Sequence, residues 1–138
     1  MPHDLDRFLL AQDQVYVGAL EELRRGRKVG HWMWFIFPQV AGLGSSSISQ
    51  TYAIRSLDEA RAYLAHPILG ARLCECARVL LATENRTAEE ILGPLDAMKL
   101  RSCMTLFGRA APDEPVFGQV LERFYGGIPD EATEARIG

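Results

Sequence analysis

The sequence lacks the segments that mark membrane and secreted proteins. Its most apolar segment, WMWFIF, ends at Pro38, far short of the roughly 18 residues of a membrane-spanning helix. The first residues, MPHDLDRF, show neither the basic nor the apolar region of a signal peptide. We therefore predict a cytoplasmic protein that does not cross a membrane.

Metal, nucleophile and nucleotide signatures are missing as well. The three cysteines, Cys74, Cys76 and Cys103, have no metal-ligand spacing, and the first two would point apart on a helix. A net charge of −3 argues against a basic protein that binds nucleic acid by releasing counterions. The basic residues within 24–28 could still form a local basic patch. We expect reduced thiols, no metal, no cofactor and no nucleic-acid partner.

The chain does contain many helix signals. Its 138 residues, 48% apolar and 24% charged, suit one globular domain with one core. Capping boxes begin at Ser56 and Thr87, while Pro67 and Pro94 suit the first position of a helix. No apolar alternation typical of strands is present. The sequence predicts an all-α protein, a single compact domain over residues 1–138, with about six main helices plus short helical turns.

Predicted helices follow one another closely along the chain. Asp4 caps the first, which continues to about Arg25, where Gly26 ends it. The others are expected near 47–54, 57–65, 67–83, 88–92, 94–108 and, capped by Asp113, 114–125. Asp130 begins a final polar turn, so residues 130–138 are expected to be less well ordered.

The stretch from Lys28 to Ala53 is the hardest to explain as scaffold. It holds both tryptophans, two of the six phenylalanines and a glycine-serine turn. Residues 29–37 fit a short buried helix or an extended core segment. Backbone amides of such a turn attract anions, and a tryptophan face can stack on a base. Alternatively, the aromatic side chains only pack in the core, and the glycine-serine turn only reverses the chain and caps a helix. The candidates here for ligand binding are Lys28, Trp32, Trp34, Gln39, Gly44 and Ser45.

Three ionisable residues are candidates for catalysis. Asp96 and Lys99 fall inside the apolar arc of their predicted helix, and burying such a pair costs several kcal/mol per ion before their attraction is counted. They form either a pocket pair or an internal ion pair between helices. His31 could act as acid or base, but no carboxylate stands at a spacing that would orient it.

One buried polar residue is expected in the first helix. Gln12 falls near the middle of that helix's apolar stripe, so its amide needs hydrogen-bond partners. It either ties the helix to a neighbouring loop or lines a ligand pocket.

Several strings resemble an uncharacterised bacterial family, the domain of unknown function numbered eighteen-ten, once labelled calpastatin-like. The HWMWFIFPQ string is the most specific, and SQTYAI, EARAYLAHPILGARL and LDAMKLRSCMTLF extend the resemblance over nearly the whole chain. It implies a compact helical domain and no established activity. It also adds Tyr52 to the residues of interest, beside Gln12, Lys28, His31, Trp32, Trp34, Gln39, Asp96 and Lys99.

A shorter string is faintly similar to NADAR-type N-glycosidases, which act on ADP-ribose-linked substrates. The string LLATENRTAEEILGPLD lacks the tryptophan-glycine pair expected after the aspartate. The similarity implies that Glu89 or Glu90, with Asp96, would stabilise an oxocarbenium-like centre.

Our functional hypothesis is binding, with hydrolysis as an extension, of a small anionic ligand such as a nucleotide or ADP-ribose derivative. Its pocket would be built around residues 28–52. The alternative is a non-enzymatic protein-interaction module or homodimer that uses WMWFIF or the outward-facing Leu10 and Val17.

Overall fold

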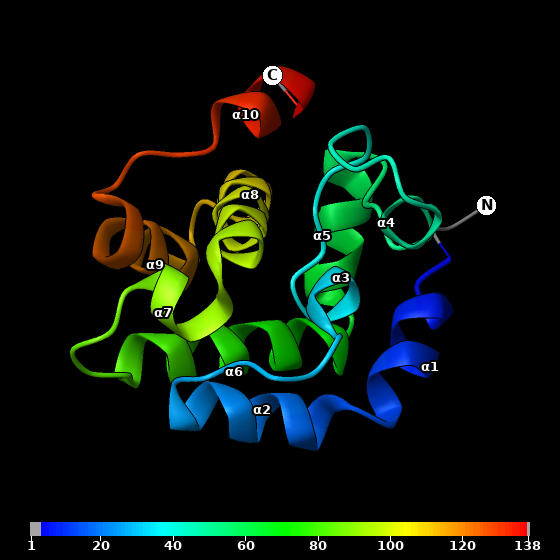
Figure 1. The fold of residues 1–138 in the computed structure, drawn as a ribbon. Coiled ribbons are helices and arrows are strands. Elements are labelled where there is room, and N and C mark those ends of the chain that lie inside the picture. Colours follow the sequence, from blue (N-terminus) through cyan, green and yellow to red (C-terminus); the bar gives the residue numbers. More distant parts are fainter. Residues whose placement is uncertain (1–3, 138) are drawn as a thin grey trace.

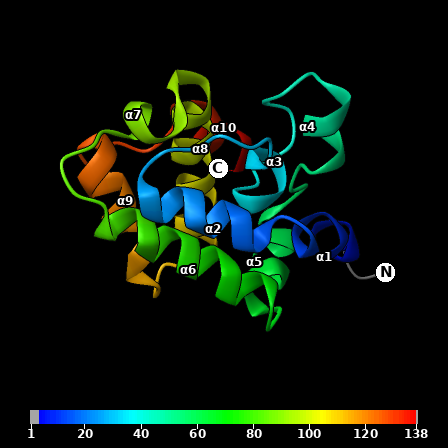
Figure 2. The ribbon, with the colours of Figure 1, turned by 60° about the horizontal axis from the view of Figure 1, so that its bottom comes forward.

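The fold is arranged around its longest helix, α8 (Pro94–Ala110), which Figure 1 shows almost end-on in the middle of the molecule. The helices that contact it most extensively are α5 (Leu57–Ala65), α7 (Ala88–Leu92), α9 (Pro115–Tyr125) and α10 (Glu131–Ile137). Along the bottom of Figure 1, α6 (Leu69–Ala82) and α2 (Tyr16–Arg25) run side by side, and Figure 2 shows the same pairing from below. The remaining helices are α1 (Asp6–Asp13), α3 (Met33–Ile36) and α4 (Ser47–Thr51).

This computed structural model describes residues 4–137 and confirms the predicted all-α class. Within that range, six helices have eight or more residues and four are shorter, and no strand is present. No helix in the described range has both the length and the apolar character needed to span a bilayer.

Capping side chains begin α5 and α7 where the sequence predicted them. At α7, Thr87 Oγ1 accepts from the Glu90 N–H at 3.0 Å, and Glu90 Oε1 accepts from the Thr87 N–H at 2.8 Å, which completes a capping box. At α5, Ser56 Oγ accepts from the Glu59 N–H, but the Glu59 carboxylate accepts from the Arg55 N–H instead. Half of that predicted box is therefore present.

The prediction of one continuous first helix is wrong. The chain breaks between α1 and α2, where the Val15 N–H bonds to the Gln12 carbonyl three residues back. Such a tight turn reorients the axis. The N-cap of α1 is Leu5, without a side-chain hydrogen bond, so Asp4 does not cap it.

Two other helix starts were misplaced by one or two residues. Glu114, not Asp113, caps α9, because its carboxylate accepts from the Val116 N–H. Pro67 does not occupy the first position of α6; His66 Nδ1 accepts from the N–H groups of Ile68 and Leu69 instead. The competing cap in each case lies next to the predicted one, so local pattern does not separate them.

A row of aromatic rings joins the helices through the core. Phe8 meets Tyr63 edge-on with ring centroids 5.1 Å apart, Tyr63 meets Phe107 at 5.3 Å, and Phe107 meets Phe117 at 6.0 Å. All four side chains are buried. Because these rings come from α1, α5, α8 and α9, their burial holds the outer helices on the central one.

The segment after α3 forms a closed loop. The Ala41 N–H donates to the Ile54 carbonyl and the Ile54 N–H donates to the Gln39 carbonyl, both at 2.8 Å. This short pairing draws residues 52–54 out of the helix predicted to reach Ile54, and α4 ends at Thr51. Residues 39–54 thus project as a loop that carries α4, capped by Ser46.

Candidate functional site

A charged cluster of Lys28, Asp96 and Lys99 lies where the segment before α3 meets the start of α8. Lys28 Nζ is 2.9 Å from Asp96 Oδ2, and Lys99 Nζ is 3.2 Å from Asp96 Oδ1. The side chains are 10%, 17% and 28% exposed, in that order. The predicted pairing of Asp96 with Lys99 is present, and Lys28 joins it from a distant part of the sequence.

Each lysine of the charged cluster also lies over a tryptophan ring. Lys28 Nζ is 5.1 Å from the centroid of Trp32, and Lys99 Nζ is 5.0 Å from that of Trp34. Such cation–π contacts favour the charged ammonium. The cluster is therefore bounded on both sides by aromatic surface, with the carboxylate between the two cations.

Glu22 on α2 shapes the backbone that delivers Lys28 and Trp32. Its Oε1 accepts from the N–H groups of Val29 and Gly30, at 2.6 and 2.9 Å, and from Trp32 Nε1 at 3.0 Å. Partial burial pushes the pKa of the Glu22 carboxyl upward, but these three donors and the nearby Lys28 charge outweigh it, so the pKa is lowered overall. The ionised carboxylate thus stabilises this backbone turn.

Because the Glu22 pKa is lower in the folded protein, its contribution to stability is present above the ordinary glutamate pKa and is lost as the pH falls through the folded value. We expect Glu22→Gln to reduce the free energy of unfolding at pH 7 by about 1 kcal/mol; solvent screening of the partly exposed carboxylate keeps this figure low. The difference from wild type should shrink as the pH drops below 4.5. Urea denaturation across pH measures it.

Glu21→Gln is the matched control for this prediction. Glu21 is the exposed neighbour on α2, and its 3.8 Å contact with Arg25 joins two exposed side chains. It should change stability little at any pH. Equal losses for the two variants, or a Glu22→Gln deficit that does not depend on pH, would contradict the role assigned to Glu22.

A groove opens beside the charged cluster, and we call it the α8 groove. Its volume is about 420 Å³, and it lies between the loop of residues 39–49, the first half of α8 and the start of α10. The described residues that line it are Trp34, Gln39, Leu43, Gly44, Ser45, Ser46, Ser49, Leu95, Met98, Lys99, Ser102, Asp130 and Ala132. Lys99 is the member of the charged cluster that reaches this groove.

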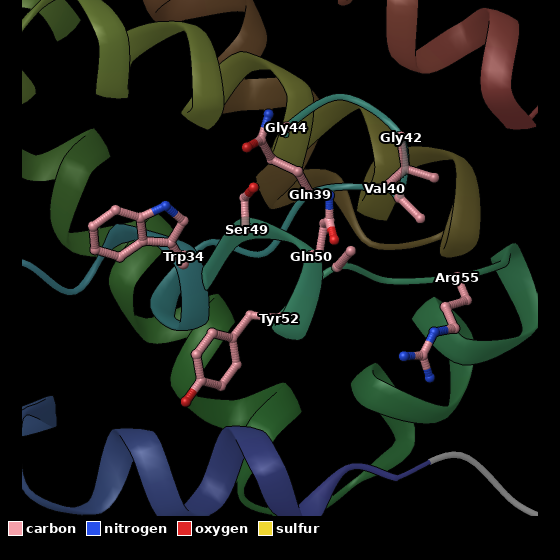
Figure 3. Close-up of a pocket in the computed structure, with 11 residues that line it drawn as sticks. Trp34, Gln39, Val40, Gly42, Gly44, Ser49, Gln50, Tyr52 and Arg55 are labelled. Atoms are coloured by element: carbon pink, nitrogen blue, oxygen red, sulfur yellow. The ribbon is translucent and has the colours of Figure 1, made fainter. Parts of the chain in front are cut away.

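A smaller pocket of about 90 Å³ adjoins the α8 groove and shares Trp34, Gln39, Gly44 and Ser49 with it. Figure 3 shows Trp34, Ser49 and Tyr52 grouped at one side of this pocket, with Arg55 well apart from them. Tyr52 also packs on Phe35, with ring centroids 5.2 Å apart. Because Trp34 lines both the α8 groove and the smaller pocket, it lies between these two hollows.

The structure brings most of the predicted site residues together. Trp34, Gln39, Gly44, Ser45 and Lys99 line the α8 groove, and Tyr52 lines the smaller pocket. Lys28, Trp32 and Asp96 are not among the described residues that line the groove, but Asp96 contacts Lys99 on its wall. Trp32 is 2% exposed and its N–H is held by Glu22, so its face does not meet solvent and Trp34 is the ring available for stacking.

Two predicted residues lie elsewhere. Gln12 is buried as predicted; its Nε2 donates to the Phe35 carbonyl at 2.6 Å and to Tyr63 Oη at 2.9 Å, and its Oε1 accepts from Arg72. These bonds match the structural alternative, a tie between α1 and α3. His31 is exposed, and it is not among the described residues that line either hollow.

The groove also contains residues that we did not predict. Leu95 is 74% exposed and Met98 is 67% exposed. Both lie on the groove wall with Asp130, the residue before α10. Leu95 and Met98 are three residues apart, which places them on one helix face. The spacing therefore indicates that Leu95 and Met98 share one face of α8. Whether that face is buried or exposed depends on where the neighbouring helices α7 and α9 pack.

Two further kinds of site can be examined in the described part of the chain: a metal site, which the sequence does not predict, and the Glu89 or Glu90 site that the N-glycosidase similarity implies. Between residues 4 and 137, no three His, Cys, Asp or Glu side chains gather to hold a metal ion. Glu90 is engaged in the α7 capping box and Glu89 is exposed. Neither is among the described residues that line the α8 groove.

Comparisons with known proteins identify relatives without an assigned activity. Residues 2–137 match the family described as "Protein of unknown function (DUF1810)", as the HWMWFIFPQ string indicated. The crystal structure of the conserved hypothetical protein Rv1873 from Mycobacterium tuberculosis is similar, with a TM-score of 0.96, 51% sequence identity, and coverage of 97% of this chain and 96% of that one. No curated protein matches the chain.

Proposed function

The chain belongs to the DUF1810 family, and we propose that its α8 groove binds a small anionic ligand such as a nucleotide or ADP-ribose derivative. The observation that carries the proposal is the position of Lys99. Its ammonium lies on the groove wall, against the Trp34 ring and one oxygen of Asp96. One side chain thus supplies a cation and its neighbour a stacking surface in the same hollow.

Lys99 is well placed to exchange one anion for another. At 28% exposure it is the most accessible member of the charged cluster, and its 3.2 Å contact with Asp96 is longer than the 2.9 Å contact of Lys28. Lys28 would continue to neutralise Asp96 when Lys99 turns to a ligand. The aspartate then keeps a partner, so the exchange avoids leaving an unpaired charge in a partly buried place.

The geometry supports binding better than hydrolysis. Both Asp96 oxygens accept from an ammonium group, and Asp96 is not among the described residues that line the groove. A general base must reach the proton that it removes directly or through one water. We therefore assign Asp96 the role of positioning Lys99 and leave it out of any direct reaction step.

The proposal is tested by Lys99→Gln, which keeps a polar side chain but removes the charge. We expect the affinity for AMP and ADP-ribose to fall about tenfold to a hundredfold, the range typical of a lost charge-assisted hydrogen bond. Lys99→Arg should retain much of the binding. Isothermal titration gives the affinity, and ligand at a hundred times its dissociation constant should stabilise the wild type by about 2.7 kcal/mol.

Arg78→Gln is the matched control, because Arg78 is an exposed cation on α6, outside the groove. Its removal should leave affinity unchanged. Equal binding by the wild type and Lys99→Gln would place the anion elsewhere. Absence of binding by all nucleotides and sugar phosphates would remove the proposed function.

A second candidate is self-association through the first two helices. Leu10 on α1 and Val17 on α2 are exposed, as predicted, whereas the WMWFIF segment is buried except for Trp34 and cannot serve as a docking surface. Sedimentation at increasing protein concentration separates the candidates. A protein that stays monomeric at every concentration would exclude self-association and would not bear on ligand binding in the α8 groove.

A further inference from the structure

We propose that the natural ligand of the α8 groove is a molecule with an aromatic or apolar body and a single negative charge, and that the groove disfavours polyphosphates. This inference rests on the proposed function and narrows its ligand class to monoanions, so ADP-ribose, which carries a diphosphate, should be one of the weaker ligands. Three features of the groove carry it: the balance of charge on its walls, the fixed position of its acidic residue, and its exposed apolar surface.

The charged side chains that line the groove balance each other. Of the described residues that line it, Lys99 and Asp130 are the charged ones, one of each sign. Lys28 and Asp96, which do not line the groove, form a second pair of opposite charges next to Lys99. One negative group on the ligand can therefore be neutralised by Lys99, but a second or third would find no further cation on the wall and would approach the Asp130 carboxylate.

Asp130 is fixed in its wall and cannot readily turn away. Its Oδ2 accepts from the Thr133 N–H at 2.9 Å and from Thr133 Oγ1 at 2.6 Å, and its own N–H donates to Thr105 Oγ1 at 2.8 Å. Thr133 is fully buried and also bonds to Ser102 across α8 and α10. The negative charge thus keeps its place as the cap of α10, whatever the groove contains.

The rest of the wall offers apolar contact. Leu95 and Met98 are among the most exposed large apolar side chains of the described chain, and they face the groove together with Leu43 and Trp34. Exposed apolar side chains that line one hollow are typical of a binding surface. A ligand body that covers them would supply affinity that does not depend on charge.

A charge series on a constant body tests the inference. The probes are adenosine, 3′,5′-cyclic AMP, AMP, ADP and ATP, titrated by calorimetry and by quenching of Trp34, since the other tryptophan is buried. We expect cyclic AMP to bind most tightly, adenosine more weakly through its apolar contacts, and ATP at least about tenfold more weakly than cyclic AMP.

Asp130→Asn provides the matched variant, because asparagine caps a helix as well as aspartate does. It should raise the affinity for ATP about tenfold and leave that for adenosine unchanged. An affinity of the wild type that rises with each added phosphate, or an Asp130→Asn variant that binds ATP no better, would overturn this inference alone. Failure of every probe to bind would overturn it together with the proposed function.

Discussion

Replacing Glu59 with alanine should reduce the free energy of unfolding by about 3–5 kcal/mol, the cost of breaking a buried ion pair from one side. Glu59 is 2% exposed, and its two carboxylate oxygens each accept from a different Arg7 nitrogen at 3.3 Å. Arg7 is 11% exposed, so removal of the carboxylate would leave its guanidinium poorly hydrated. The Arg55 N–H, which donates to Glu59 at 2.8 Å, would also lose its partner.

The same pair supports the smaller pocket. Arg7 donates to the carbonyls of Thr51 and Ala53, at 2.9 and 2.7 Å, on either side of Tyr52. We therefore expect Glu59→Ala to loosen the residues that carry Tyr52 as well as to destabilise the fold. Urea denaturation measures the loss through the transition midpoint.

Asp58→Ala is the matched control for Glu59→Ala. Asp58 lies in the same first turn of α5 and pairs with Arg61, but both side chains are exposed, and such pairs contribute roughly 0–1 kcal/mol. The double variant Arg7→Met with Glu59→Leu should recover only part of the lost stability. An apolar pair needs no compensation for desolvation, but it leaves the Thr51 and Ala53 carbonyls and the Arg55 N–H without these partners. A Glu59→Ala loss no larger than that of Asp58→Ala would show that the pair does not stabilise the fold.

Gly70→Ala should destabilise the protein by about 3 kcal/mol or more, because a side chain cannot be placed there without moving the backbone. A Cβ atom at Gly70 would lie 2.1 Å from the Leu64 carbonyl oxygen at the end of α5. Gly70 is buried, and its N–H donates to the His66 carbonyl at 3.0 Å. The close passage of α5 and α6 thus requires glycine.

Gly118→Ala tests the same change where space is open. Gly118 is exposed within α9, and nothing lies within 4 Å of a Cβ placed there. Alanine should raise the free energy of unfolding by about 0.5–1 kcal/mol, since it lowers the entropy of the unfolded chain. In thermal or urea denaturation, the transition midpoints of the two variants should therefore shift in opposite directions. A Gly70→Ala variant as stable as wild type would contradict the requirement for glycine where α5 and α6 pass each other.

Local patterns predicted the start of a helix well where the sequence offers a single candidate capping residue. The Thr87 capping box is complete, and Pro94 occupies the first position of α8. Predictions failed where neighbouring residues offered rival caps, as with Asp113 and Glu114. They also failed between α1 and α2, where the apolar stripe predicts one continuous helix. In the structure the chain breaks just after Gln12, whose side chain bonds to Phe35 and Tyr63.

The candidate site could be predicted only in part. Asp96 and Lys99 are one helical turn apart, so their pairing follows from spacing. The third member, Lys28, belongs to a distant segment that meets α8 only after folding. Likewise the exposure of Leu95 and Met98 depends on where α7 and α9 pack on α8, which periodicity within α8 does not specify.

By itself, the sequence determined that this protein is all-α, that Gln12 is buried and that Asp96 pairs with Lys99, because capping, periodicity and residue spacing act over a few neighbouring positions. The tertiary structure decided that Trp34 and not Trp32 faces a hollow, that Lys28 completes the charged cluster, and that Asp130, the residue before α10, lines the groove. Those outcomes depend on how separate helices pack against one another, and no local pattern contains that information.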